Sequence, residues 1–556
     1  MKHVPRKRRF RRQRAGAHAR SAREAAFAVL SEYKNAGRFV STLLEPFFNS
    51  DALASPDERR LAVELTNGVV RREATLDAIL HPHVERPRHR IEGELWTLLQ
   101  LGAYQLVFLD SIPAYAAVNE TVALARSLGR ERWAGFVNGV LRNVERMRLC
   151  PKTGTDPLPE GQTRFPATTG QGSVPFFGQS QRTLTQEFQT VPDSAAVPVS
   201  EGRYRRLGRT VFSDPSIDPA AYFAEAFSFP RWLASRWQAR FGFEELCRIG
   251  FWFNQPSPLT LRVNPLRARR EDLIRALAES GIAATPGTLP ESIRLEGTAR
   301  VDTLPGFAEG FFTVQDESAM QAVERLAPQP GETILDLCAA PGTKTTHIAE
   351  RMRNQGRIVA TDIREDRLDR VAQNCARLGI SIVQPILIND SAPARRLCPK
   401  TGTDPLPEGQ TRFPATTGQG SVPFFGQSPA RTAKSSAADP TAGPFDAILA
   451  DVPCSNTGVL GKRPEARWRM NEPEIAELAA RQLQLLESAC GRLRPGGRIV
   501  YSTCSIEPEE NEQIVRTLLS RATDLALVGQ WQLVPGRPGD GGYQALLIRQ
   551  GPAATG

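Results

Sequence analysis

The sequence has 556 residues, of which 40% are hydrophobic, and it carries a formal net charge of +10. This length is too great for one ordinary hydrophobic core, so we expect two to four domains. No segment resembles a membrane span of about 20 apolar residues, and the eight scattered cysteines contain no CxxC pair, which argues against zinc ribbons and disulfide frameworks. We therefore predict a cytoplasmic protein that binds neither a membrane nor a metal.

The first 20 residues, "MKHVPRKRRFRRQRAGAHAR", carry nine Lys or Arg residues and no acidic residue. The other 536 residues therefore sum to about +1. A disordered basic tail of this kind binds polyanions by neutralising phosphates and releasing counterions. We expect it to contact RNA, although a solvated tail that only aids solubility is the alternative.

A helical region follows the tail. Its first segment, "SAREAAFAVLSEY", is a capping box in which Glu24 stands three residues after Ser21. Apolar residues then recur at helical spacing, and no strand-like alternation breaks the pattern. We predict an all-helical domain over residues 21–147.

One segment occurs twice, with 33 identical residues at 148–180 and at 396–428. It is rich in Pro, Gly and Thr, and it lacks the short period and apolar face of solenoid repeats. Such a sequence has little apolar surface to bury. We predict a dispensable surface insertion, within a low-complexity linker over 148–219 and a second insert over 393–443.

Two further regions contain strands. Residues 220–310 read as a small α/β subdomain with helical runs around the strand "PLTLRVNPL". From 311 to 550, short apolar strands such as "TILDLC", "GRIVATD", "FDAILADV" and "GRIVYSTC" alternate with helical stretches. This alternation predicts a doubly wound, Rossmann-like α/β sheet that binds ligands at the carboxyl ends of its strands.

The first strand of that sheet runs into "DLCAAPGTKTTHIAE", whose small residues let the backbone approach a ligand ahead of a helix. Thr343 separates Gly342 from Lys344, which argues against a P-loop, and the absence of GxGxxG argues against a dinucleotide fold. The remaining common nucleoside cofactor is S-adenosylmethionine. Acidic residues support it at the following strand ends, although each alone would also suit a helix N-cap: Asp362, Asp390 and Asp451.

Two cysteines also follow strands, Cys454 in "DVPCSNTG" and Cys504 in "YSTCSIEPEENE". Thiols at two strand ends suggest a shared site, in which a thiolate would serve as nucleophile. From the residues alone, either cysteine could be the one that attacks.

These motifs carry a resemblance. "DLCAAPGTKT", "DVPCSNTG" and "YSTCSIEPEENE" resemble the Sun (Fmu) family of RNA cytosine carbon-5 methyltransferases. The helical region, with "NGVVRR" and "FVNGVLRNVERM", is similar to the NusB-like RNA-binding domain that the bacterial 16S ribosomal RNA methyltransferase B branch carries. The resemblance covers about residues 20–147 and 220–550. It departs from the family at Thr343, where Gly is usual, and at the repeated insert.

The resemblance implies an S-adenosylmethionine-dependent enzyme that forms 5-methylcytosine in small-subunit ribosomal RNA. We separately expect a monomer. Cys504 would attack carbon 6 of cytosine and Cys454 would release the product, while Asp451 would lie near the cytosine amino group. The implied cofactor-binding residues are Cys338, Ala339, Ala340, Pro341, Gly342, Thr343, Lys344, Asp362, Asp390 and Asp451.

The stretch "GKRPEARWRM" offers a way to hold the RNA, because basic side chains bind phosphates and an aromatic ring can stack on a base. We predict this role for Arg463, Arg467, Arg469 and Trp468, with a solvated basic face as the alternative. Two other functions stay open: the same chemistry on transfer RNA, and a non-catalytic RNA-binding or ribosome assembly factor.

Overall fold

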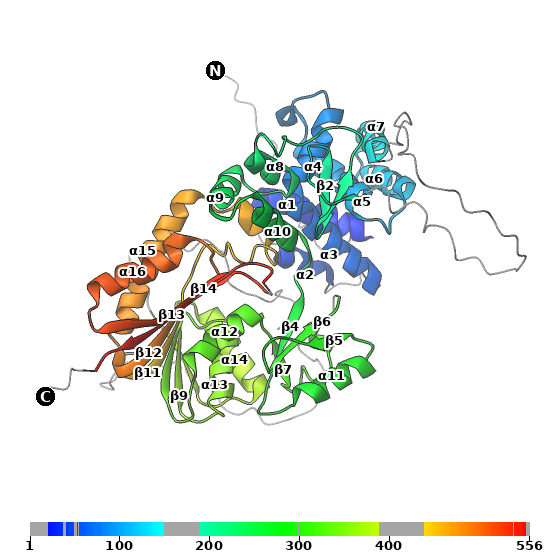
Figure 1. The fold of residues 1–556 in the computed structure, drawn as a ribbon. Helices are drawn as coiled ribbons and strands as arrows, with labels where there is room; N and C mark the ends of the chain where they lie inside the picture. The colour runs from blue at the N-terminus through cyan, green and yellow to red at the C-terminus, as the bar shows by residue number, and fades with distance from the viewer. Residues whose placement is uncertain are drawn as a thin grey trace, which may run out of the picture. The chain divides into compact units, whose positions relative to one another are not determined.

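The computed structural model describes residues 21–36, 40–48, 53, 55–148, 188–297, 300–388, 439–537 and 539–551. The basic tail, Asp390 and the repeated segments, apart from Arg148, lie outside the described residues. The chain divides into two compact units, Met1–Asn254 and Gln255–Gly556 (Figure 1). Each unit is described by itself.

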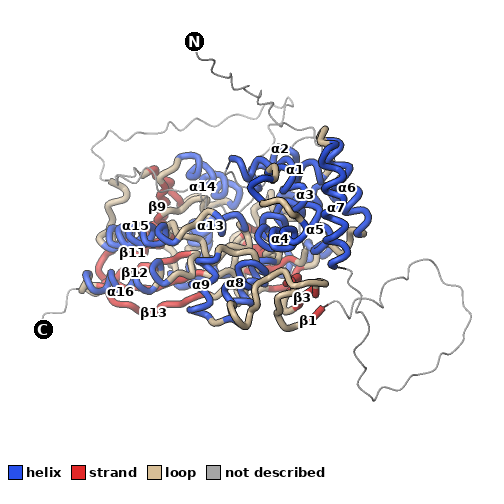
Figure 2. The backbone as a smooth tube through the Cα atoms, turned by 90° about the horizontal axis from the view of Figure 1, so that it is seen from above, coloured by secondary structure: helices blue, strands red, loops and turns tan. Residues whose placement is uncertain are grey.

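The first unit begins with a bundle of α-helices, which lie together in Figure 2. Every residue from Leu95 to Val107 in helix α5 is buried, so this helix lies at the centre of the bundle. The helical fold that the sequence predicts for this N-terminal region is confirmed. The helices are α1 (Ala22–Ala36), α2 (Val40–Phe48), α3 (Pro56–Arg71), α4 (Glu73–Leu80), α5 (Gly93–Phe108), α6 (Ala114–Ser127) and α7 (Glu131–Arg148).

The same unit continues with an antiparallel sheet in the order β1-β3-β2 and with three helices. These elements are β1 (Phe188–Gln189), β2 (Ala196–Ser200), β3 (Arg203–Arg206), α8 (Pro219–Ala226), α9 (Arg231–Phe241) and α10 (Phe243–Asn254). The ring of Tyr204 in β3 packs against Phe251 in α10, with centroids 5.2 Å apart. Part of the range 148–219 that we predicted as a linker is therefore folded, and residues 220–254, which we placed in the small α/β subdomain, belong to this unit instead.

The second unit opens with a four-stranded antiparallel sheet in the order β5-β6-β4-β7. Leu261, Ile293 and Phe312 from three of its strands pack with Leu273 of helix α11 in one buried core. The small α/β subdomain is therefore present, but it begins after residue 254 and not at the predicted residue 220. Its elements are β4 (Leu259–Val263), α11 (Arg270–Glu279), β5 (Ala284–Pro286), β6 (Ser292–Leu295) and β7 (Phe312–Val314).

A seven-stranded sheet forms the rest of the second unit, in the order β10-β9-β8-β11-β12-β14-β13. The first five strands are parallel, and β14 runs antiparallel to both of its neighbours. The predicted doubly wound sheet is confirmed, with an antiparallel hairpin added at one edge. Its strands are β8 (Thr333–Leu337), β9 (Arg357–Asp362), β10 (Val383–Leu387), β11 (Phe445–Asp451), β12 (Leu493–Thr503), β13 (Leu525–Leu533) and β14 (Gly542–Arg549).

Helices cover both faces of this sheet (Figure 1). One buried core joins the sheet to α12 (Glu317–Leu326), α13 (Thr343–Arg351) and α14 (Glu365–Leu378). The other core joins it to α15 (Glu472–Cys490) and α16 (Glu512–Arg521). The strand order reverses between β8 and β11, and ligands of open α/β sheets bind at the carboxyl ends of the strands beside such a reversal.

Among the described helices, none combines the length and the apolar character that a membrane crossing requires.

Candidate active site

The turn after β8 is shaped by two residues with positive φ angles, Cys338 (+62°) and Gly342 (+98°). A Cβ atom on Gly342 would lie 3.1 Å from the Cα of Val371, so this position favours glycine for both its φ angle and its space. Thr343 is the first residue of helix α13. Because helical backbone has a negative φ, the Thr at this family Gly position is accommodated without strain.

Two carboxylates flank the turn. Asp336 is fully buried in β8 and accepts a 2.6 Å hydrogen bond from the Thr345 hydroxyl. Burial raises the pKa of Asp336 to about 7, although that hydrogen bond opposes the change. Asp362 is the last residue of β9, and burial raises its pKa while Arg367 opposes the change.

Each of these two carboxylates has an oxygen atom that could accept a hydrogen bond from a ligand. Oδ1 of Asp336 and Oδ2 of Asp362 are buried and have no hydrogen-bond partner among the described residues, although Arg367 lies 3.4 Å from Oδ2 of Asp362. Buried polar atoms in native proteins are usually satisfied. A nucleoside with free ribose hydroxyls fits this arrangement of a close backbone turn, a helix N-terminus and a carboxylate at the next strand end.

Lys344 joins the turn to the end of β11. Its Nζ lies 2.7 Å from Oδ2 of Asp451. Burial is the largest single influence on the pKa of Lys344 and would lower it, but the charge and the hydrogen bond of Asp451, together with Cys504 and Asp336, outweigh burial and raise it.

The two cysteines come together because β11 and β12 are adjacent parallel strands, with Asp451 paired to Ser502. The Sγ atoms of Cys454 and Cys504 lie 3.0 Å apart. The hydrogen bond to Cys504 and burial together raise the pKa of Cys454 well above its ordinary range. Cys504 donates a 3.0 Å hydrogen bond to Oδ1 of Asn456, whose amide nitrogen donates in turn to the Cys454 carbonyl at 2.9 Å.

The sequence reading missed the polar residues that support this pair. Asn456 has a φ angle of +61°, and Glu510 is fully buried beside the loops that carry both cysteines. The acidic run "EPEENE" directly after a strand end was the available signal for Glu510. The neighbouring sequence does not show which acidic residue of that run is buried in the folded protein.

The predicted RNA contacts are only partly compatible with the structure. The Arg467 side chain is fully buried and reaches the Leu460 carbonyl, so the prediction that it holds RNA phosphates is wrong. Arg463, Trp468 and Arg469 are partly exposed and keep that predicted role. Asp390 cannot be placed, because it lies outside the described residues. Within the described part of the chain, no group of three His, Cys, Asp or Glu residues could hold a metal.

Three family models match the chain in succession. The model of the NusB family matches residues 20–146, and a ferredoxin-like domain of the RsmF/B-like methyltransferases matches residues 229–302. The model described as 16S rRNA methyltransferase RsmB/F matches residues 323–400 and 430–535. The last match contains both cysteine loops and the turn after β8.

Curated relatives match over almost the whole chain. The ribosomal RNA small subunit methyltransferase B of Salmonella paratyphi B is 33% identical over 537 residues, covering 95% of this chain and 98% of the relative. The probable ribosomal RNA small subunit methyltransferase B of Synechocystis sp. is 32% identical over 506 residues, covering 91% and 90%. The crystal structure of PH0851 has a similar fold, with a TM-score of 0.62, 23% identity, and coverage of 95% of this chain and 97% of that one.

Proposed function

The chain belongs to the RsmB/F family of 16S rRNA methyltransferases, and on that premise we propose that it methylates carbon 5 of a cytosine in 16S ribosomal RNA. The observation that carries the proposal is the pair of thiols 3.0 Å apart beside the Lys344–Asp451 ion pair. Thiols are the nucleophiles that this chemistry needs. An assembly factor without catalytic activity would have no use for such a pair.

We propose that S-adenosylmethionine binds at the turn Cys338–Lys344, with the ribose hydroxyls on Asp362. Asp451 and the undescribed Asp390 complete the proposed set. When bound, this cofactor supplies an electrophilic methyl group. The small buried side chains of Ala339 and Ala340 keep the turn narrow, so that backbone atoms can approach the ligand closely.

Carbon 5 of cytosine is a poor nucleophile, and a thiolate that adds to carbon 6 converts the ring into an enamine that can react at carbon 5. Once carbon 5 carries the methyl group, a base takes the proton from carbon 5, and the electron pair of that C–H bond restores the ring double bond and expels the sulfur from carbon 6 as a thiolate. One difficult step is thereby divided into several easier ones. We assign the attack to Cys504, which is the role that the resemblance to the Sun family implies for the cysteine of the Thr-Cys motif. Cys454, whose raised pKa keeps it protonated, is assigned to product release.

The target base must be single-stranded or flipped out of a helix, because carbon 6 is not accessible in a duplex. Arg463, Trp468, Arg469 and the basic tail would supply phosphate and stacking contacts. We also propose that the protein acts as a monomer in the cytoplasm, where a reducing environment keeps both thiols free.

The deciding experiment is transfer of labelled methyl groups to naked 16S ribosomal RNA, assembled small subunits and transfer RNA, followed by mapping of the modified base. We expect 5-methylcytosine in 16S ribosomal RNA. Labelling of transfer RNA alone would favour the first alternative. Tight RNA binding without any methyl transfer would favour the non-catalytic assembly factor.

A further inference from the structure

Glu510 is a fully buried acid at the end of the short helix η7 (Pro508–Glu510). Burial raises the pKa of its carboxyl group, and hydrogen bonds from Ser455, Ser505 and Gln482 oppose that change. A buried carboxylate is costly unless it is well satisfied. The number of donors aimed at this side chain therefore indicates a defined role for it.

Those donors come from both cysteine loops. Oε1 of Glu510 accepts from the backbone N–H of Ser455 at 2.8 Å, and Oε2 accepts from the hydroxyls of Ser455 and Ser505. Ser455 directly follows Cys454, and Ser505 directly follows Cys504. One carboxylate thus spans the residues next to both thiols.

Gln482 of helix α15 strengthens the connection. Its Nε2 donates to Oε1 of Glu510 and to the carbonyl of Pro453, the residue before Cys454, at 2.9 Å in both cases. The Tyr501 hydroxyl donates to the Glu510 backbone carbonyl at 2.6 Å. The acid itself is therefore held in place from α15 and from β12.

We propose that Glu510 is a positioning residue that fixes the Cys454 and Cys504 loops relative to each other, so that one thiol stays within reach of the covalent intermediate formed by the other. It touches no reacting atom in this role. The catalytic part of this proposal rests on the proposed function. The positioning of the two thiols can nevertheless be tested without RNA.

The chemistry requires such a device because attack and release use different sulfurs at the same base. Displacements of about 1 Å in a reacting pair can cost about 100-fold in rate. Glutamine can replace most of the contacts, since its oxygen can accept from Ser455 N–H and Gln482 while its amide group donates to the two serine hydroxyls. Alanine can replace none of them.

The first test measures the thiol pair directly. Wild type, Glu510→Gln and Glu510→Ala are treated with diamide, which takes two electrons and two protons from a pair of thiols, and the Cys454–Cys504 disulfide is quantified by mass spectrometry. We expect Glu510→Ala to form it about tenfold more slowly and Glu510→Gln within about twofold of wild type. An unchanged rate in Glu510→Ala would overturn the proposal.

The matched control is Glu332→Ala, which removes a partly buried pair with Arg498 (2.7 and 2.8 Å) near the amino end of β8, away from the cysteine loops, and should leave the disulfide rate unchanged. If Glu510→Ala does not fold, the double variant Ser455→Ala and Ser505→Ala removes both hydroxyl donors. It should slow disulfide formation about threefold, and a wild-type rate there would likewise overturn the proposal.

The second test uses S-adenosylmethionine and 16S ribosomal RNA. Glu510→Ala should accumulate RNA joined through Cys504 on a denaturing gel, because release needs Cys454 nearby, whereas a merely destabilised enzyme would lose attack as well. Normal release despite a slower disulfide rate would overturn the proposal. Absence of methyl transfer by the wild type would overturn the proposed function alone, since the thiol test does not depend on it.

Discussion

Lys344 Nζ lies 2.7 Å from Asp451 Oδ2, and this contact joins the first turn of helix α13 to the last residue of strand β11. The two side chains are only partly exposed, at 16% and 31%. The ion pair therefore links the proposed cofactor turn to the proposed cytosine site, and each partner screens the charge of the other.

Breaking this pair from either side should have similar consequences. Lys344→Met and Asp451→Asn should each lower single-turnover methyl transfer by about 100-fold, and the double variant should be little worse than either single variant because the partners act as a unit. The control is Asp366→Asn, which breaks an exposed pair with Arg364. Fully additive losses in the double variant would contradict this coupling.

The two cysteines should fail in different ways. Cys504→Ser should lose activity by about a thousandfold or more while still binding RNA, since a serine hydroxyl is a far weaker nucleophile at neutral pH. Cys454→Ser should still attack and methylate but then stall, giving an RNA-dependent, slowly migrating protein band on a denaturing gel. A trapped band with Cys504→Ser instead would reverse the assigned roles.

Asp362→Asn should weaken S-adenosylmethionine binding by about tenfold, because the loss of a charged acceptor for ribose hydroxyls costs about 1.5 kcal/mol. Isothermal titration calorimetry measures this directly. Asp366→Asn, in the next helix, should leave the dissociation constant within twofold of the wild-type value, by the same order-of-magnitude reasoning. Equal affinities for Asp362→Asn and wild type would remove Asp362 from the proposed cofactor site.

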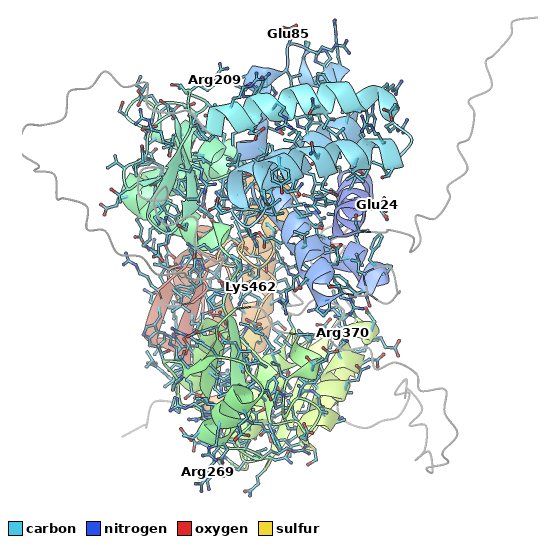
Figure 3. The ribbon with its side chains drawn as sticks, turned by 90° about the vertical axis from the view of Figure 1, so that its right-hand side faces the viewer. Glu24, Glu85, Arg209, Arg269, Arg370 and Lys462 are labelled. Carbon is cyan, nitrogen blue, oxygen red and sulfur yellow. The ribbon has the colours of Figure 1, made fainter. Side chains whose placement is uncertain are left out.

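A separate prediction concerns acid stability. Lys462, labelled in Figure 3, bridges Asp316 and Asp540. Burial alone would raise the pKa of Asp316, but Lys462 and the hydrogen bonds from Ser318 lower it to about 2. Because the pKa of Asp316 is lower in the folded protein than in the unfolded chain, its ionised form stabilises the fold at pH values above the unfolded pKa of about 4. About 2 kcal/mol of unfolding free energy should therefore be lost as the pH falls from 4 towards 2.

Chemical denaturation of wild type and Asp316→Asn across this pH range checks the sign. The difference in unfolding free energy between the two proteins should shrink as the pH falls. A difference that stays constant or grows would show that Asp316 does not titrate as predicted.

Local patterns account for the parts of this protein that could be predicted. Helical periodicity in the first unit and the strand–helix alternation of the second unit depend on neighbours in sequence, and so do the motifs that follow β8, β11 and β12. Strands β1 to β3 escaped prediction because they contain at most five residues and become stable only by packing on helices such as α10.

Long-range contacts explain the other differences. An arginine in a basic stretch is expected at the surface, yet Arg467 is buried by residues that its local sequence does not specify. Glu510 differs from Glu509 only in what surrounds it after folding, because Ser455 and Gln482 approach it from separate elements. Such roles depend on tertiary packing and not on motif spacing.

The strand order also determines where the chain tolerates added sequence. Strands β10 and β11 are separated by β9 and β8, so their connection must already bridge three strand spacings, about 14 Å. Doubling the length of such a connection costs only about 0.6 kcal/mol in closure entropy. A longer turn in a hairpin such as β13–β14 would instead risk changing the pairing register of its two strands. A copy of the 33-residue segment in this connection should therefore add little closure cost, and the same position should accept a fluorescent label or an affinity tag.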